Sequence, residues 1–195
     1  MEEEKKPVTI VLFSGEMDKA IAAFVIATAA ASMGLPVNIF FTFWGLNVIK
    51  KEGGLIKGQN WMQRMLNIMN YGHARRLALS RMNFLGMGPA MLKVMMKQKK
   101  VPSLKEFIET ARSLGVKFYP CEMSMTVMGL KKEDFLDECD EVIGAVSYLA
   151  IAKESDVNLF IYEGAEKVFE RPAVGKHINI WSIACAPLNI QAILL

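Results

Sequence analysis

Cys121 is the residue of this 195-residue chain whose type and position most directly suggest chemistry. It follows an apolar run at residues 116–120 that predicts a buried strand, and it precedes residues 122–129, which predict the start of a helix. A thiol at this point would lie at the carboxyl end of a strand, where open α/β sheets place their functional sites. A helix N-terminus also favours the thiolate, which is the reactive form of cysteine. The alternative is a small buried side chain that only packs.

The other two cysteines, Cys139 and Cys185, are weaker candidates for chemistry. Cys139 lies among four carboxylates within residues 137–141, and these would raise the pKa of its thiol and make it a poor nucleophile. Cys185 lies near the end of the chain and has no partner that the sequence identifies. The cysteines form no CxxC pair, and the chain has only two histidines. The sequence therefore predicts neither a metal site nor a bound cofactor.

Charge is distributed unevenly along the chain. The formal net charge is +3, yet residues 53–105 contain ten basic residues and no acidic one. Eight of the fourteen methionines lie within residues 61–96, so we call residues 61–100 the basic Met-rich segment. Such a segment is typical of surfaces that contact an anionic membrane or an adaptable protein groove, although methionine also fills seams in cores. It has few aromatic residues and no known RNA- or DNA-binding motif, so we expect no nucleic-acid partner.

The elements that would position Cys121 begin with a strand–helix–strand unit. Residues 8–13 predict a buried strand, residues 17–33 a helix that ends before Gly34 and Pro36, and residues 37–43 a second strand. The loops after these strands would share an edge of the sheet with the thiol. This places five candidates around a substrate pocket: Ser14, Gly15, Thr42, Trp44 and Glu122.

The apolar stretch from residue 20 to residue 49 contains no charged side chain and resembles a membrane span by hydropathy. Gly34 and Pro36 interrupt it near the middle, however, and its second half predicts a strand. A buried helix followed by a buried strand is the better interpretation. The polar residues 1–6 and the odd number of cysteines predict a cytoplasmic protein, whose contact with a membrane would be peripheral.

The second half of the chain predicts further alternating elements. Ser103 and Glu106 form a capping box before a helix that ends at Gly115, and residues 144–153 and 157–161 predict another helix and strand. This order predicts an α/β fold, a parallel β-sheet flanked by helices on both faces. We expect a domain at residues 1–161 with a helical Met-rich excursion at about 53–100. Residues 162–195 would form a C-terminal extension, packed on this domain or on a neighbouring subunit.

Several strings in this pattern resemble the DsrE/DsrF-like proteins of sulfur relay, in particular a DsrE-like subgroup that is sometimes described as a peroxiredoxin family. They are FTFWGL at 41–46, NFLGMGP at 83–89 and CEMSM at 121–125. The resemblance covers about residues 8–161. It implies a parallel-sheet homo-oligomer, a trimer or hexamer, in which the cysteine matching Cys121 accepts sulfane sulfur as a persulfide. It also implies a rhodanese-type donor and a TusA-like carrier as partner proteins.

Three functions are therefore considered. The first is a sulfur-relay protein, acting as a sulfurtransferase or sulfur carrier through a persulfide on Cys121. The second is a thiol redox protein of peroxiredoxin type, which would need a threonine shortly before the cysteine, where this chain has Phe118, Tyr119 and Pro120. The third is a non-catalytic oligomeric interaction module, or a membrane-peripheral module, that uses residues 61–100.

Overall fold

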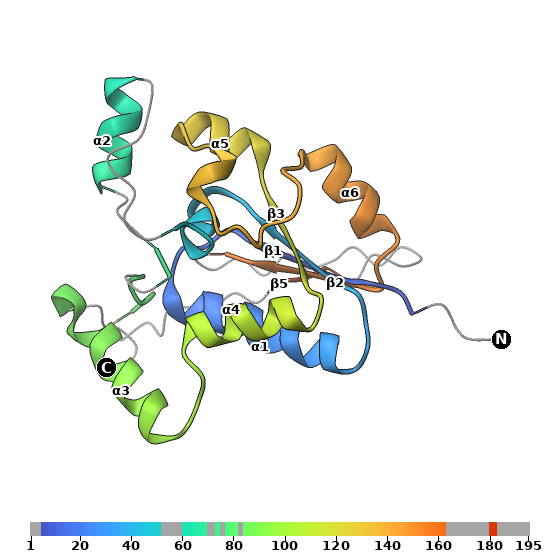
Figure 1. Ribbon diagram of the computed structural model, residues 1–195, viewed down its shortest axis with the longest axis horizontal. Helices are drawn as coiled ribbons and strands as arrows, with labels where there is room; N and C mark the ends of the chain where they lie inside the picture. Colours follow the sequence, from blue (N-terminus) through green and yellow to red (C-terminus); the bar gives the residue numbers. More distant parts are fainter. Residues whose placement is uncertain are drawn as a thin grey trace, which may run out of the picture.

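The computed structural model describes residues 5–51, 60–69, 73–74, 77–81, 84–162 and 180–182 of the chain. Its centre is a five-stranded sheet in the order β3-β2-β1-β4-β5, and every neighbouring pair of strands is parallel. The strands are β1 (Val8–Leu12), β2 (Val37–Phe41), β3 (Lys117–Pro120), β4 (Val157–Ile161) and β5 (Ile180–Ser182). The predicted parallel α/β fold is confirmed (Figure 1).

Helices cover both faces of the sheet, as predicted. The α-helices are α1 (Met17–Ser32), α2 (Trp61–Met69), α3 (Met87–Gln98), α4 (Leu104–Ser113), α5 (Glu122–Met128) and α6 (Ala145–Lys153). Three short 3₁₀ helices are η1 (Phe43–Val48), η2 (Phe84–Gly86) and η3 (Lys132–Asp134). Figure 1 shows α1 and α4 side by side on one face and α6 on the other. Within the described residues, no helix combines the length and apolarity that crossing a bilayer requires.

Helix α1 packs closely on the sheet because its inner side is built from small residues. Ala20, Ala23 and Ala27 are fully buried, and between them Phe24 reaches the strands. The Phe24 ring meets the Phe118 ring of β3 edge to face, with centroids 5.6 Å apart. This arrangement explains most of the uncharged stretch at residues 20–49, because the majority of its apolar side chains pack in the core.

The alternation of side chains along the strands divides the core unequally between the two faces. Ile10, Ile39 and Phe118 point toward α1 and α4 and belong to a large apolar cluster. Val11 and Phe40 point to the opposite face, where the cluster is small and, among the described helices, α6 packs against it. Parallel strands bury both faces, so even this thinly covered side is apolar.

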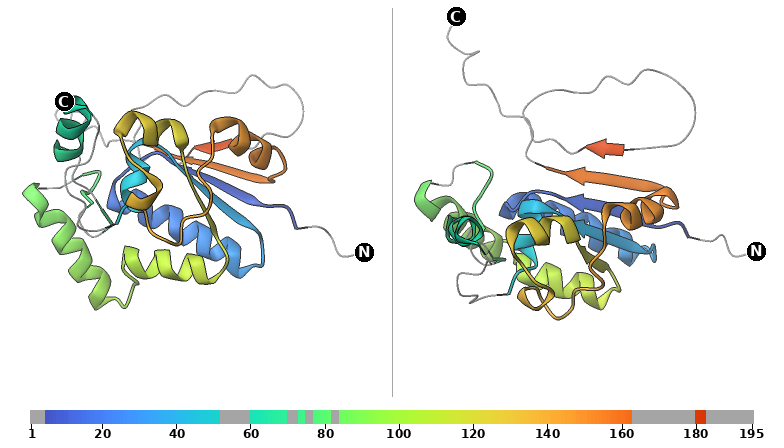
Figure 2. Two further views of the ribbon diagram at one scale, coloured as in Figure 1. Left: turned by 45° about the horizontal axis from the view of Figure 1, so that its top comes forward. Right: turned by 90° about the horizontal axis from the view of Figure 1, so that it is seen from above.

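The excursion between β2 and β3 contains α2, η2 and α3, so its predicted helical character is confirmed. Gly86 takes a left-handed conformation, with φ +96°, and α3 begins at the next residue. Gly88 and Pro89 lie in the first turn of α3, where a missing N–H costs nothing because that turn has no carbonyl partner for it. Figures 1 and 2 show α2 and α3 at the end of the molecule away from the start of β1.

Part of the C-terminal extension adds an edge strand to the sheet. β5 pairs with β4 in parallel, with Asn158 opposite Ile180 and Phe160 opposite Ser182. These residues of the extension thus pair with a strand of their own subunit. Residues 163–179 and 183–195 lie outside the described residues, as does Cys185.

Gly45 provides a test of how closely the loops after β1 and β2 approach each other. A Cβ atom on Gly45 would clash with the backbone carbonyl of Leu12, whereas a Cβ on Gly144 would come no nearer than 3.8 Å to any other group, the Glu122 carboxylate. We expect Gly45→Ala to lower the free energy of unfolding by about 1–3 kcal/mol, because the backbone at Leu12 or Gly45 must shift to make room for the added methyl group. Gly144→Ala should change it by less than about 0.5 kcal/mol. Urea denaturation measures both, and equal effects would contradict the packing described.

Candidate functional site

Cys121 lies directly beyond β3 and begins α5, as the sequence predicts. Its N–H donates a hydrogen bond of 2.9 Å to the carbonyl oxygen of Phe41, which extends the β2–β3 ladder by one residue. Its carbonyl oxygen accepts the first helical hydrogen bond of α5, from Met125. The residue is therefore held on one side by the sheet and on the other by the helix.

A second segment, around Ile143, fixes Cys121 from its free side. Ile143 forms an isolated parallel bridge with Cys121. The Ile143 N–H donates to the carbonyl of Pro120 at 3.1 Å, and the N–H of Glu122 donates to the carbonyl of Ile143 at 3.1 Å. The backbone around Cys121 is thus hydrogen-bonded to neighbouring segments on both sides, although β3 is an edge strand of the sheet.

The thiol is buried on the thinly covered face. Cys121 is only 4% exposed and clusters with Val11, Phe40 and Ile143. The half-buried side chains of Tyr148 and Ile151 cover this cluster from α6, and the Tyr148 ring stacks on the Phe40 ring with centroids 4.7 Å apart. Among the described residues, the thiol is therefore little accessible to a second molecule.

Thr42 is linked to the site through a residue that sequence reasoning missed. Its hydroxyl hydrogen-bonds to the Ser124 hydroxyl at 2.9 Å, and both side chains are buried. Because Ser124 lies in α5, this bond joins the end of β2 to the helix that Cys121 begins. A serine within the apolar run 122–129 was a signal that a polar partner must exist, but the sequence does not reveal which residue it is.

Glu122 follows Cys121 in sequence, but its side chain is exposed whereas the thiol is buried. The Glu122 carboxylate lies 3.8 Å from the position that a Cβ on Gly144 would occupy. It is not part of the buried cluster around Cys121. Glu122 therefore lies at the outer surface where the chain enters α6.

Ser14, Gly15 and Trp44 form a group of their own at the ends of β1 and β2. The Ser14 hydroxyl donates to the Glu16 carboxylate at 2.8 Å, and Glu16 forms an ion pair with Lys19. A Cβ on Gly15 would lie 2.6 Å from the carbonyl oxygen of Trp44, so glycine permits this approach. The loops after β1 and β2 share one edge of the sheet, as predicted. The contacts of Ser14, Gly15 and Trp44 given above lie within and between these two loops and do not involve Cys121.

A cavity of about 870 Å³ lies elsewhere, between α1, α3 and α4. None of the five candidate pocket residues lines it. Their assignment to a substrate pocket thus remains a prediction. Within the described part of the chain, no group of three His, Cys, Asp or Glu side chains is placed to hold a metal ion.

Cys139 has the raised pKa that the sequence predicts, but for a different main reason. Burial raises the pKa of its thiol to about 12, and the carboxylates of Asp140 and Glu138 raise it further, while Arg112 opposes them. The neutral thiol packs in the large core cluster. Cys139 is therefore a structural residue.

Asp140 ties the segment that leads to Ile143 onto the start of β3. It accepts hydrogen bonds from the guanidinium of Arg112 at 2.7 Å, the N–H of Phe118 at 2.8 Å and the ammonium of Lys117 at 3.2 Å. Burial alone would raise the pKa of Asp140, but these donors hold that pKa below its ordinary value. These hydrogen bonds of Asp140 keep the segment from Asp140 to Ile143 in register with β3.

Comparisons with known proteins identify relatives over most of the chain. The model of the DsrE/DsrF/DrsH-like family matches residues 4–160. The uncharacterized protein YrkE of Bacillus subtilis is 45% identical over 161 residues, covering 83% of this chain and all of YrkE. The sulfur carrier protein DsrE2 of Allochromatium vinosum is 34% identical over 161 residues, covering 81% of this chain and 99% of DsrE2.

Two solved structures are also similar. The YchN protein of E. coli has a TM-score of 0.47 at 9% identity, over 79% of this chain and 98% of YchN. The protein MTH1491 of Methanobacterium thermoautotrophicum has a TM-score of 0.38 at 12% identity, over 75% of this chain and 91% of that protein.

Thr42→Val tests the link between β2 and α5. The change keeps the shape of the side chain but leaves the buried Ser124 hydroxyl without its partner, so unfolding free energy should fall by about 1–3 kcal/mol. Thr42→Val/Ser124→Ala should recover part of this loss, because neither hydroxyl then remains unpaired. Thr110→Val, on the exposed side of α4, is the control. Chemical denaturation measures all three, and a neutral Thr42→Val would contradict the assigned role.

The raised pKa of Cys139 predicts a pH dependence of stability. The folded pKa of about 12 exceeds the ordinary value of about 8.5, so folding keeps a proton that the unfolded chain loses at high pH. The stabilising contribution is complete below about pH 8.5 and declines as pH rises toward 12. The stability difference between wild type and Cys139→Ala should therefore shrink by about 1 kcal/mol or more between pH 8 and 10. A constant difference in denaturation experiments would refute this.

Proposed function

This chain belongs to the DsrE/DsrF/DrsH-like family, and from that premise we propose that it is a cytoplasmic sulfur-relay protein that carries sulfane sulfur on Cys121. One observation carries the proposal: Cys121 ends a strand of the parallel sheet, in a chain 34% identical to a protein named as a sulfur carrier. The comparisons support this function over the thiol-peroxidase and interaction-module alternatives. Burial does not distinguish the two described cysteines, but the raised pKa of the Cys139 thiol makes it a poor nucleophile, and Cys121 is the one that lies at the carboxyl end of a strand.

The proposed reaction needs one thiolate and no external oxidant. The Cys121 thiolate attacks the outer sulfur of a donor persulfide, R–S–SH. A new S–S bond forms on Cys121 while the donor S–S bond breaks, and the electron pair leaves with the donor thiolate. The same exchange, with an acceptor thiolate attacking the outer sulfur of Cys121–S–SH, passes the sulfur on. A rhodanese-type donor and a TusA-like acceptor fit these two roles, and we propose a homotrimer or homohexamer as the working assembly.

Burial of the thiol would protect the persulfide between the two transfers. Val11, Phe40 and Ile143 surround Cys121 with apolar atoms, and α6 excludes water from above. Access then depends on α6, none of whose side chains is fully buried. A helix held by so few contacts can open locally at low cost in free energy. We therefore propose that a partner gains access by displacing α6.

Intact-protein mass spectrometry after incubation with polysulfide tests the sulfur-accepting step. Wild type and Cys139→Ala should each gain sulfur that a reductant removes, and Cys121→Ala should gain none. Peptide mapping then locates the added sulfur. Equal labelling of Cys121 and Cys139, or a Cys121 that stays unmodified in the native protein and reacts only after denaturation, would overturn the proposal.

Ile151→Ala tests the proposed opening of α6. The side chain of Ile151 lies over the Cys121 cluster, so its truncation should ease opening by about 1 kcal/mol and speed alkylation of Cys121 about fivefold. Val146→Ala, on the outer face of the same helix, is the matched control and should leave the rate unchanged. Time-resolved labelling with iodoacetamide gives both rates. The same rate in both variants would show that α6 does not control access.

A further inference from the structure

The basic Met-rich segment presents an apolar stripe that the proposed sulfur chemistry does not use. Met87, Met91, Val94 and Met95 follow helical spacing along one side of α3, and each is between 50% and 69% exposed. At 100° per residue they fall within about one third of the helix circumference. The interpretation of methionine as filling of a core seam is wrong for this stripe.

The opposite side of α3 contacts the rest of the protein. Gly88 and Pro89 are buried, and Leu92 packs against the large core cluster. Helix α3 is thus attached along one side and presents large apolar side chains on the other. Four solvated apolar groups on so short a helix are unfavourable unless something covers them.

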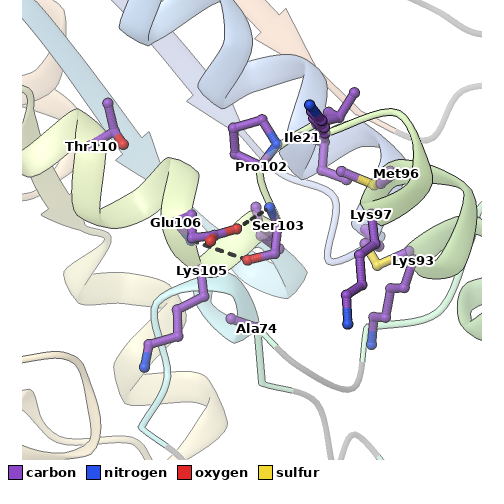
Figure 3. Close-up of a pocket in the computed structure, with 14 residues that line it drawn as sticks. Ile21, Ala74, Lys93, Met96, Lys97, Pro102, Ser103, Lys105, Glu106 and Thr110 are labelled. Atoms are coloured by element: carbon purple, nitrogen blue, oxygen red, sulfur yellow. Dashed lines mark hydrogen bonds between the residues drawn. The ribbon is translucent and has the colours of Figure 1, made fainter.

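Cationic side chains border the stripe. Figure 3 shows the side chains of Lys93 and Lys97 from α3 and of Lys105 from α4 extending in the same direction, at the edge of the cavity of about 870 Å³. Two carboxylates of α4 lie among these residues: Glu106, whose oxygen accepts from the Ser103 N–H in the capping box, and Glu109, which lies 3.7 Å from Lys105. The described side chains of α3 itself include lysines and no carboxylate.

We propose that α3 docks on the surface of an anionic phospholipid bilayer through a Met–Lys surface made of Met87, Met91, Val94, Met95, Lys93, Lys97 and Lys105. The apolar stripe enters the boundary of the acyl chains, and the lysines contact lipid phosphates while their stems lie along the interface. The positive charge of these lysines identifies an anionic bilayer as the partner of this surface, because lipid phosphates carry the opposite charge. A symmetric contact with a second copy would bring two positive surfaces together.

Helix α2, at the same end of the molecule as α3 (Figures 1 and 2), also exposes large apolar side chains. It carries Trp61, Met62 and Met65, all exposed, and tryptophan is enriched where proteins meet the bilayer interface. Gln63 and Asn67 of α2 donate hydrogen bonds to carbonyls at the end of α5, including that of Met128 at 2.9 Å. Docking would therefore hold the membrane at the end of the molecule where the strands end, near α2 and the C-terminal end of α5 (Figure 1). This inference does not depend on sulfur transfer.

Sedimentation with lipid vesicles tests the docking of the full-length chain. Vesicles of phosphatidylcholine mixed with phosphatidylserine should bind it, and vesicles of phosphatidylcholine alone should bind it much more weakly. Each lysine near an anionic surface contributes about a fivefold factor in binding, so Lys93→Gln/Lys97→Gln should weaken binding by about 25-fold. Met91→Ser should weaken it about tenfold, because one anchor no longer enters the apolar layer.

Matched changes elsewhere serve as controls. Lys132→Gln/Lys153→Gln removes the same charge from exposed positions outside the segment, and Leu149→Ser removes an exposed apolar side chain from α6. Both should bind vesicles as wild type does. Equal binding to both kinds of vesicle, no binding, or binding that the α3 variants do not weaken would each overturn the proposal. Binding to soluble polyglutamate without vesicle binding would point to an acidic protein instead.

Discussion

The hydrogen bond from the Cys121 N–H to the Phe41 carbonyl is the constraint on which the site depends. It continues the β2–β3 register one residue beyond the strand, so side chains keep alternating between the two faces. Phe118 therefore packs in the large core, and Tyr119 and Cys121 face α6. A slip of one residue would move the thiol into the core beneath α1 and α4, where no single helix can open to release it.

The two faces of the sheet differ in how tightly they are packed, and Cys121 lies on the less tightly packed face. The face beneath α1 and α4 is built from fully buried aromatic rings in contact, including those of Phe24, Phe41 and Phe118. The face beneath α6 is thin, and the outer side of that helix exposes Val146 and Leu149. A rigid sheet thus holds the Cys121 sulfur atom in position, and our proposal is that displacement of the weakly attached α6 gives partners access to it. The Met–Lys surface would add a third role, the attachment of the molecule to a membrane.

The fold could be predicted from the sequence because its signals are local. The apolar run before Ser14, the capping box of Ser103 and Glu106, and the stop at Gly34 each define an element without reference to distant residues. The interior of the site could not be predicted from the sequence, because its structure depends on which segments, distant in the sequence, come into contact. Ile143 beside Cys121 and Ser124 beside Thr42 are tertiary pairings that a single sequence does not encode in any short pattern. Burial as the main cause of the raised Cys139 pKa was missed for the same reason.

The central claim is that Cys121 carries sulfur between partners, and release of the sulfur tests this most directly. The persulfidated protein, freed of donor, is mixed under anaerobic conditions with excess of a thiol-containing carrier protein, and sulfane sulfur on each protein is followed by cyanolysis. The account predicts that sulfur leaves the native chain and appears on the acceptor in equal amount. Sulfur that remains on Cys121 until the protein is denatured would contradict it and would make Cys121 a buried packing residue with incidental reactivity.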